Sequence, residues 1–187
     1  MVGYKVAVGI DSVEGPFLVV VRLETLSEST VITPNNRIQL VTGCPILYYV
    51  GDILNEYNFP SVPDKEEIQQ YRTDAAFIKE IIPIDRNYKP NNWNGLAYSI
   101  YDVSERLIQN QAYLDIPYFV YIKDKTVFSN LSIRIEDTCG KGIHFFETIE
   151  DAIYYFAYDC GSFIINEFRG IRNAWRMESR ILKELVE

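Results

Sequence analysis

Residues 139–156, CGKGIHFFETIEDAIYYF, constrain the fold of this chain more than any other stretch. Gly140 and Gly142 permit a tight turn, because glycine adopts a positive φ at little steric cost. The apolar residues 143–146 follow and are typical of a short strand, which contains the only histidine of the chain, His144. The stretch therefore predicts a rigid turn that leads into a strand.

A helix is predicted directly after this strand. Thr148 stands three residues before Asp151, which is a variant of the capping box that marks a helix N-terminus. Apolar residues then recur at helical spacing, at Ile149, Ala152, Ile153, Phe156 and Ala157. Gly161 is suited to end the helix. We therefore expect a helix over residues 149–159 whose apolar stripe packs on the strand that contains Phe145.

Other apolar runs bounded by turn residues predict strands. Residues 17–23 form a β-branched run suited to a buried strand, and residues 4–10 alternate weakly. Residues 75–84 predict a further strand. A hairpin is predicted from residues 116–122 and 126–135, with its turn at Lys123, Asp124 and Lys125.

Further helices are expected in three places. Asp64 is suited to cap a short helix through Ile68, because acidic residues occupy its first turn. Residues 99–111 indicate a second helix, and residues 162–187 fit a helix or a hairpin, with the helix favoured. We therefore predict a single α+β domain over residues 1–187, a mostly antiparallel sheet with two or three packed helices. Residues 162–187 are its helical or hairpin appendage.

The composition is that of a packed globular protein. Apolar residues make up 48% of the 187 residues and charged residues 24%, which excludes a disordered chain. Aromatic residues reach 14%, with 14 Tyr and 10 Phe. Because tyrosine combines a large apolar body with a polar tip, such a composition suits either a core or a protein interface.

The charge balance argues against a nucleic-acid partner. The net charge is −8, from 18 basic and 26 acidic residues, whereas affinity for a phosphate backbone depends on clustered Lys and Arg. The one basic cluster, around Arg169, Arg172 and Arg176, is interleaved with glutamates and is interpreted as a solvated face. We predict no nucleic acid among the partners.

The cysteines predict neither a metal site nor a disulfide framework. Cys44, Cys139 and Cys160 form no C-x-x-C pair, and a single histidine does not complete a zinc ligand set. We therefore expect no metal and no cofactor. The first residues do not read as a secretory leader, and no apolar run is long enough to span a membrane. Reduced thiols and a chain that is neither secreted nor in a membrane are the expectation.

No complete catalytic set is present in the sequence. Cys139 and His144 are close enough along the chain for a thiolate–imidazole pair, but a structural role for His144 in the strand is favoured. Tyr71 and Arg72 gather an aromatic ring and hydrogen-bond donors ahead of a strand, which fits either a small-ligand pocket or a solvated turn. Non-enzymatic function is therefore favoured, and the alternative stays open.

Residues 140–156 (GKGIHFFETIEDAIYYF) resemble the G-K-G-[IV]-Y-F signature of ADP-ribosyltransferases of the poly-ADP-ribose polymerase type. In that family the tyrosine of the signature flanks the nicotinamide, and a separate histidine holds the ribose. His144 stands at the tyrosine position here, and the chain has no second histidine. The resemblance implies a nucleotide-ligand module, either a degenerate transferase or a protein that sequesters a signalling nucleotide.

A longer resemblance is to an uncharacterised accessory domain of large DNA viruses and some phages, often found beside pentapeptide or MORN-like repeats. Its pattern ends in C-[SG]-x-G-I-H-F-F-x-T-x-E-[ED]-A-x-x-Y, which residues 139–154 match. Residues 21–25 (VRLET), 71–78 (YRTDAAFI) and 99–102 (SIYD) supply the earlier blocks in the same order. The resemblance implies a viral origin and an α+β domain, and hence a location in the host cytoplasm or the virion.

These observations lead to two predictions of function. The first is a virus-encoded, non-enzymatic binding or structural protein that acts through an aromatic-rich interface with a viral or host protein or with itself, a virion component being one form. The alternative is the nucleotide-ligand module. The candidate ligand or interface residues are Tyr71, Arg72, Cys139, Gly142, His144, Phe145 and Phe146.

Overall fold

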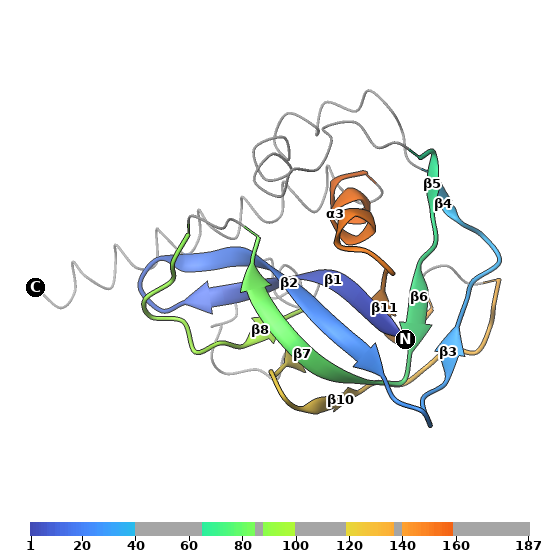
Figure 1. Ribbon diagram of the computed structural model, residues 1–187, viewed down its shortest axis with the longest axis horizontal. Helices are drawn as coiled ribbons and strands as arrows, with labels where there is room; N and C mark the ends of the chain where they lie inside the picture. The colour runs from blue at the N-terminus through green and yellow to red at the C-terminus, as the bar shows by residue number, and fades with distance from the viewer. Residues whose placement is uncertain (40–64, 85–87, 100–118, 137–139, 159–187) are drawn as a thin grey trace, which may run out of the picture.

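The computed structural model describes residues 1–39, 65–84, 88–99, 119–136 and 140–158. Most of this part of the chain is antiparallel β-sheet, with one helix packed against it (Figure 1). The sheet begins with a long hairpin, in which β1 (Val2–Asp11) pairs with β2 (Gly15–Thr25) along its whole length. Gly15 closes the hairpin turn with a φ of 92°.

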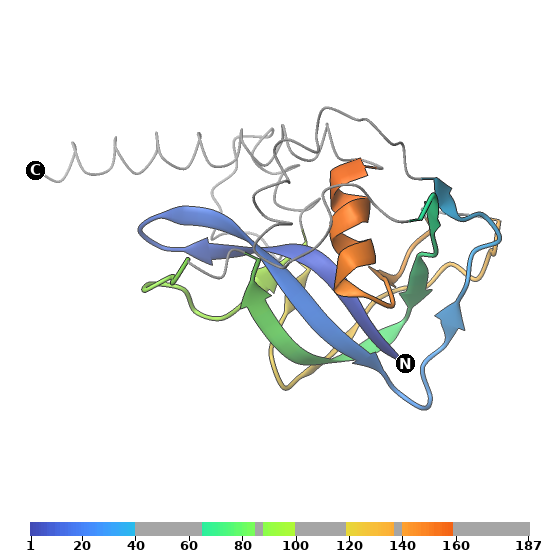
Figure 2. The same ribbon diagram turned by 45° about the horizontal axis from the view of Figure 1, so that its top comes forward.

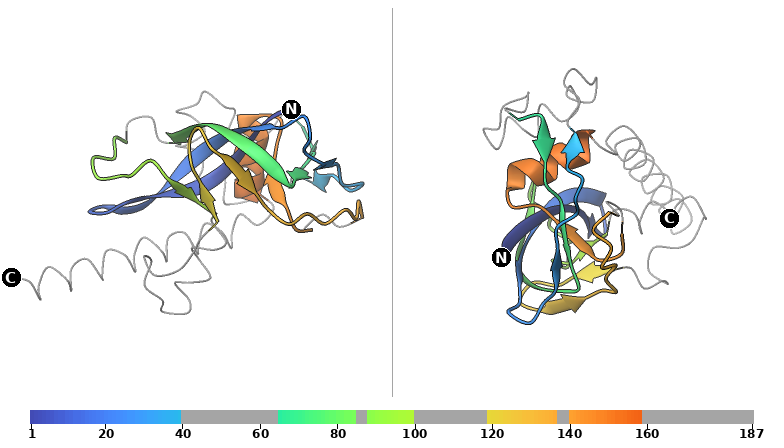
Figure 3. Two further views of the ribbon diagram at one scale, coloured as in Figure 1. Left: turned by 90° about the horizontal axis from the view of Figure 1, so that it is seen from below. Right: turned by 90° about the vertical axis from the view of Figure 1, so that its right-hand side faces the viewer.

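The hairpin lies at the centre of a six-stranded sheet with the order β10–β7–β2–β1–β8–β9. All its pairs are antiparallel. The further strands of the sheet are β7 (Ala75–Pro83), β8 (Ala97–Tyr98), β9 (Val120–Tyr121) and β10 (Thr126–Phe128). The outermost strands β9 and β10 are neighbours in the sequence, joined by a turn in which Lys125 N–H donates to the Ile122 carbonyl at 3.2 Å. The sheet is therefore strongly curved (Figure 3).

A three-stranded sheet completes the curvature. Its central strand β6 (Tyr71–Thr73) lies between β3 (Val31–Ile32) and β11 (Ile143–Phe145) and runs through Asp74 into β7. After β11, Phe146 bridges back to Tyr4 of β1 through two backbone hydrogen bonds of 2.8 and 2.9 Å. Backbone pairing thus passes from β1 to β2, to the β7–β6 strand, to β11 and back to β1. The small sheet β4 (Ile38–Gln39) with β5 (Glu67–Ile68) lies beside this ring.

Two apolar clusters lie on opposite faces of β1 and β2. Ala7, Val19 and Val21 point into the curved sheet, where Phe145 and Ile78 are also buried. Val8 and Val20 point to the other face, which is covered by helix α3 (Ile149–Tyr158), as Figure 2 shows. Strands buried on both faces read as near-continuous apolar runs, which explains the run at residues 17–23.

The strand–helix unit predicted from residues 139–156 is confirmed over its described part. β11 follows the glycine turn, and the Asp151 N–H donates to Thr148 Oγ1 at 3.1 Å, so Thr148 caps α3. Ala152, Ile153 and Phe156 are buried on the sheet. Residues 159–161, including Gly161, lie outside the described residues.

The predicted fold class is wrong in its helices. The described residues form mostly antiparallel sheet with a single short helix, α3, and not two or three packed helices. At the first predicted helix, Glu67 and Ile68 form β5, because Ile68 packs as a buried strand residue against the apolar cluster under α3. Almost all of the predicted helix at 99–111, and all of residues 162–187, lie outside the described part of the chain.

The predicted hairpin around residues 123–125 is also wrong in its pairing. The turn is present, with Asp124 at a φ of 62°, but β9 pairs with β8 and β10 pairs with β7. β10 ends at Phe128, short of the predicted residue 135. The curvature of the sheet separates the two partners, which a local pattern of apolar residues does not encode.

The tip of the β1–β2 hairpin is held by a buried carboxylate. Asp11 is 1% exposed, and its Oδ1 accepts hydrogen bonds from the backbone N–H groups of Val13 at 2.8 Å and Glu14 at 2.9 Å. Its Oδ2 accepts from the N–H of Asn92 at 3.0 Å. Burial acts to raise the pKa of Asp11, but these backbone donors outweigh it and hold the pKa below 3.8. Asp11 therefore ties the loop of Asn92 to the hairpin.

Candidate functional site

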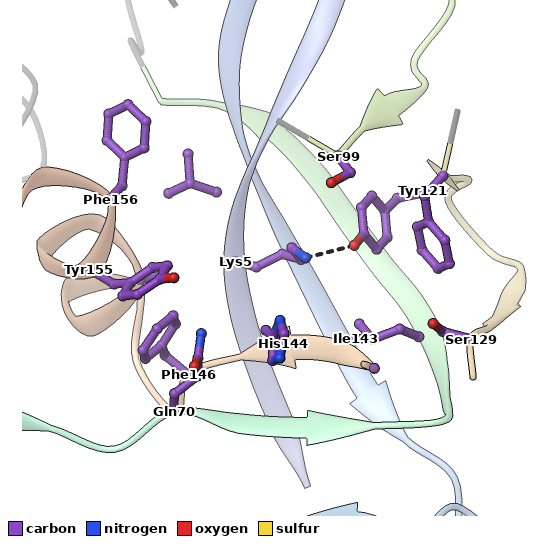
Figure 4. Close-up of a pocket in the computed structure, with 14 residues that line it drawn as sticks. Lys5, Gln70, Ser99, Tyr121, Ser129, Ile143, His144, Phe146, Tyr155 and Phe156 are labelled. Atoms are coloured by element: carbon purple, nitrogen blue, oxygen red, sulfur yellow. Dashed lines mark hydrogen bonds between the residues drawn. The ribbon is translucent and has the colours of Figure 1, made fainter. Parts of the chain in front are cut away.

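A cavity of about 280 Å³ lies along the edge of β1 that faces away from β2. On this edge Tyr4 bridges to Phe146 and Val8 pairs with Tyr98. Lys5 and Val6, which lie between these two contacts, line the cavity. The cavity thus occupies the place where β11 and β8 diverge from β1, and α3 covers its other side (Figure 4).

Lys5 supplies the positive charge of the cavity. Its Nζ donates to the Tyr121 hydroxyl at 2.7 Å and lies 5.0 Å from the centre of the Tyr121 ring. Among the described residues, no acidic side chain lines the cavity and none forms a salt bridge with Lys5. An ammonium group has three donors, and the described residues use one of them, for Tyr121. An anion in the cavity could accept from the others.

His144, on β11, lies beside Lys5 of β1 (Figure 4). Burial lowers the pKa of His144 from 6.5 to about 4; the charges of Lys5 and Arg72 act in the same direction, and a hydrogen bond with the Gly140 backbone opposes them. The ring is therefore neutral at physiological pH. Its Nε2 atom is buried and has no hydrogen-bond partner in the described part of the chain.

Gln70 is a further polar residue that lines the cavity, and the residue as a whole is 5% exposed. Its side-chain amide is not among the buried polar atoms that lack a hydrogen-bond partner. Figure 4 shows the Gln70 amide between Phe146 and His144. The amide can therefore offer a donor and an acceptor to a molecule in the cavity.

Aromatic rings form the two walls of the cavity. On the helix side the rings of Phe146 and Tyr155 lie 5.0 Å apart, with Phe156 next to them. On the opposite side the rings of Phe119 and Tyr121 lie 5.1 Å apart. β1 and β11 lie between the two walls and position Lys5 and His144 there (Figure 4). The walls suit a flat apolar group.

The floor of the cavity depends on Arg72 and Gly142. Arg72 pairs with His144 across β6 and β11, is fully buried, and donates from Nε to the Ser132 carbonyl at 3.0 Å and from Nη2 to the Arg134 carbonyl. Gly142 has a φ of 144°, and a Cβ atom there would lie 2.8 Å from Leu131 Cδ1 and 3.2 Å from Arg72 Cβ. Only glycine fits this position without strain.

The structure brings part of the predicted site together. Gly142, His144 and Phe146 line the cavity. Phe145 points into the core, where its ring stacks on Tyr71 at 5.6 Å and covers Gly3. The Tyr71 hydroxyl donates to Glu147 at 3.1 Å.

Arg72 is fully buried and donates to backbone carbonyls, so it does not lie in a solvated turn. Its role as a ligand or interface residue stays a prediction. Cys139 lies outside the described residues, so the disfavoured alternative of a Cys139–His144 pair is not tested.

Several cavity residues were missed by sequence reasoning. They are Lys5, Gln70, Ser99, Phe119, Tyr121, Ser129 and Tyr155. Lys5 carried one readable signal. It shares a face of its strand with Gly3 and Ala7, which are small and buried, and a lysine among such residues is unusual on an inward face. For Phe119, Tyr121 and Ser129 no local signal exists, because the curvature of the sheet brings them to β1.

No group of His, Cys, Asp and Glu side chains in the described ranges is arranged to hold a metal ion. Among the same residues, no helix has the length and apolar character needed to cross a membrane.

No protein-family model, curated protein or solved structure matches this chain.

Proposed function

We propose that the protein binds a small, flat, anionic molecule in the cavity between β1, β11 and α3. The observation that carries this proposal is the convergence of three polar groups at the cavity. They are the Lys5 ammonium, which forms no salt bridge within the described residues, the Gln70 amide, and the imidazole of His144, whose buried Nε2 has no hydrogen-bond partner there. Two aromatic walls enclose them. A bound molecule would satisfy the polar groups and bury its ring between the walls.

The size of the cavity supports a compact ligand. A volume of about 280 Å³ lies near the lower end of the range for small-molecule sites, about 300–1,000 Å³. One aromatic ring system with a short acidic substituent fits such a volume. A nucleoside monophosphate is the form that this proposal takes if the prediction of a nucleotide module is correct.

The positions of the aromatic side chains favour ligand binding over an aromatic protein interface. Among those whose burial is described, only Phe128 is exposed, at 70%. The others are buried or half-buried, and all of them except Phe77 and Tyr98 lie in the two clusters or around the cavity. The aromatic content thus supports cores and a cavity more than a contact surface.

The single histidine makes a direct test practical. We would follow the imidazole signals of His144 by NMR while adding benzoate, indole-3-acetate or uridine 5′-monophosphate. At least one of these anions should move the signals in a saturable manner. Lys5→Met should weaken that binding about ten-fold or more, because a charge-assisted hydrogen bond is lost.

The matched control is Lys123→Met, which removes an exposed lysine at the β9–β10 turn and should leave binding unchanged. Neutral 3-methylindole should bind more weakly than indole-3-acetate. Absence of saturable shifts with all three anions, or equal binding by Lys5→Met and the parent, would refute the proposal.

A second proposal keeps the protein interface. Phe128, Ile133 and Ile135 are exposed at 70%, 75% and 46%, and all lie in the segment that follows the β9–β10 turn. This cluster supports contact with a viral or host protein, or with a second copy. Light scattering and pull-down would compare the parent protein with a double variant that carries Phe128→Ser and Ile133→Ser. A parent that is a monomer and captures the same proteins as the double variant would contradict the proposal. The viral origin inferred from residues 139–154 stays a prediction.

A further inference from the structure

The described lining of the cavity carries few charged groups. Among the described residues that line it, Lys5 is the single cation and no carboxylate is present. Burial lowers the pKa of His144 to about 4, so its imidazole adds no charge at neutral pH. The other polar residues of the lining, such as Gln70, Ser99 and Ser129, are uncharged. The described lining therefore carries one positive charge.

A second buried cation, Arg72, lies behind this lining. Its side chain is fully buried and does not line the cavity. Its Nε donates to the Ser132 carbonyl at 3.0 Å, and its Nη2 donates to the Arg134 carbonyl. These bonds hold the guanidinium against the backbone of residues 132–134. Lys5 is therefore the cation that a molecule in the cavity contacts.

The number of charges on a ligand decides how well such a lining binds it. The attraction to one ammonium grows in proportion to the charge of the ligand, whereas the Born cost of removing an ion from water grows with the square of that charge. A second negative charge thus doubles the attraction to Lys5 but quadruples the desolvation cost. The lining is mostly apolar, and its Tyr121, Ile143 and Phe146 are each 2% exposed or less. It offers few groups that would solvate a second charge.

We infer that the cavity selects anions with a single negative charge, so that its ligand is a flat aromatic carboxylate or a phosphodiester with the same charge. The anionic group meets Lys5, which donates to the Tyr121 hydroxyl at 2.7 Å, and the ring lies between the two aromatic walls. A phosphate monoester, which carries two charges above its second pKa of about 6, is disfavoured. The inference rests on the proposed binding function and names the ligand class for that site.

Monomethyl esters isolate the effect of the second charge. Benzylmalonate and its monomethyl ester share the ring, but the ester has one charge fewer and is larger by one methyl group. Uridine 5′-monophosphate and its methyl phosphodiester form the same kind of pair with a phosphate. Calorimetric titration of the full chain at pH 8, where both parent acids carry two charges, compares the affinities within each pair. It also distinguishes a carboxylate ligand from a phosphodiester.

In every pair that binds, we expect the ester to bind about ten-fold or more tightly than the dianion, because the second charge of the dianion is desolvated without a partner. A dianion that binds as tightly as its ester, or more tightly, would overturn the inference and leave the binding of flat anions standing. If none of the four probes binds, the inference is also overturned. Benzoate and indole-3-acetate, titrated alongside, then decide whether anion binding itself fails with it.

A second cation in the lining should change this preference. Ser129 is half-buried at the cavity, and its hydroxyl donates only to the neighbouring Asn130 carbonyl, at 3.2 Å, within the described residues. Ser129→Lys should strengthen the binding of the dianion relative to its ester about ten-fold. The matched control Ser12→Lys adds the same charge at the exposed hairpin tip and should leave the preference unchanged. Equal effects of the two variants would contradict the inference, and the two pairs decide it on the parent protein even if Ser129→Lys fails to fold.

Discussion

The buried polar groups near the two ends of β1 differ in whether they are hydrogen-bonded. At the hairpin tip, Asp11 is 1% exposed, and both of its oxygens accept backbone hydrogen bonds. Near the other end, around Lys5, Nε2 of His144 is buried without a hydrogen-bond partner in the described part of the chain. One end of β1 thus adjoins buried oxygens that are hydrogen-bonded, and the other end adjoins a buried nitrogen that is not.

The difference distinguishes polar groups that stabilise the fold from polar groups that we propose to serve binding. A buried carboxylate that accepts three N–H groups stabilises the loop it holds, because charge-assisted hydrogen bonds offset its desolvation. The unpaired Nε2 of His144 stabilises nothing in the free protein. The cavity proposed to bind a ligand lies at this end of the strand, and the contrast can be tested at each end.

The largest effect on stability is expected at the hairpin tip, where the buried carboxylate of Asp11 is hydrogen-bonded. Asp11→Ala leaves the N–H groups of Val13, Glu14 and Asn92 without their acceptor and should lower the free energy of unfolding by about 3–4 kcal/mol. Denaturant unfolding measures the change. Glu136→Ala, which removes an exposed carboxylate, should stay within about 0.5 kcal/mol. A cost for Asp11→Ala no larger than that of the control would break the comparison.

The next prediction concerns pH: the two ends of β1 should lose their contributions to stability over different pH ranges. The pKa of His144 is lowered to about 4 in the folded protein, so at pH below 6.5 the unfolded state binds a proton that the folded state does not. Stability should be fully present above pH 6.5, fall by about 3 kcal/mol toward pH 4, and level off below, since 1.36 kcal/mol corresponds to one pKa unit.

The contribution of Asp11 has the same sign but a lower window. Its pKa lies below 3.8 in the folded protein, so that contribution is present above pH 3.8 and is lost as the pH falls through the folded pKa. Unfolding curves of the parent and of His144→Phe across this range make the measurement. A parent that loses no more stability than His144→Phe between pH 6.5 and 4 would contradict a buried neutral His144.

Gly142→Ala should damage the cavity end alone, by about 2 kcal/mol, because it adds a Cβ at positive φ and against Leu131. Gly95→Ala is the matched control: its φ is also positive, at 81°, but its Cβ would meet no atom within 4 Å. The difference between the two variants isolates the clash. Backbone amide signals around His144 should shift in Gly142→Ala while those around Asp11 stay in place; a shift at both ends would show that the two regions are coupled.

The smallest effect has the opposite sign. Gln70→Leu replaces an amide in the cavity lining, in a residue that is 5% exposed, by an apolar group. It should stabilise the protein by about 1 kcal/mol while weakening the binding of an anion. The exposed Gln39, which donates to Glu67 at 3.1 Å, offers Gln39→Leu as a control with little effect. Destabilisation by Gln70→Leu would mean that the amide forms stabilising hydrogen bonds in the free protein, and Gln70 would then resemble Asp11 in this comparison.

Sequence reasoning found the elements whose causes are local. The run at residues 17–23 became β2, residues 75–84 became β7, and Thr148 caps α3 as the spacing to Asp151 predicted. β-Branched runs and caps depend on neighbouring residues, so they can be read along the chain.

What failed depends on contacts distant in the sequence. Ile68 follows a cap and acidic residues that favour a helix, yet it is a strand residue paired with Ile38. The cavity unites Lys5, Gln70, Tyr121 and His144 from four separate parts of the chain. Of these four, the sequence predicted only His144 as a site residue, because the curvature of the sheet decides which side chains meet it.

The closing contact between Tyr4 and Phe146 has a consequence for synthesis. β1 is synthesised well before Phe146, so the outer edge of β1 stays uncovered at Tyr4 until Phe146 has been made. A nascent or truncated chain that stops short of Phe146 therefore exposes an apolar strand edge that is prone to pair with other chains. The cavity, whose lining includes Phe156, is complete only after that residue has been made.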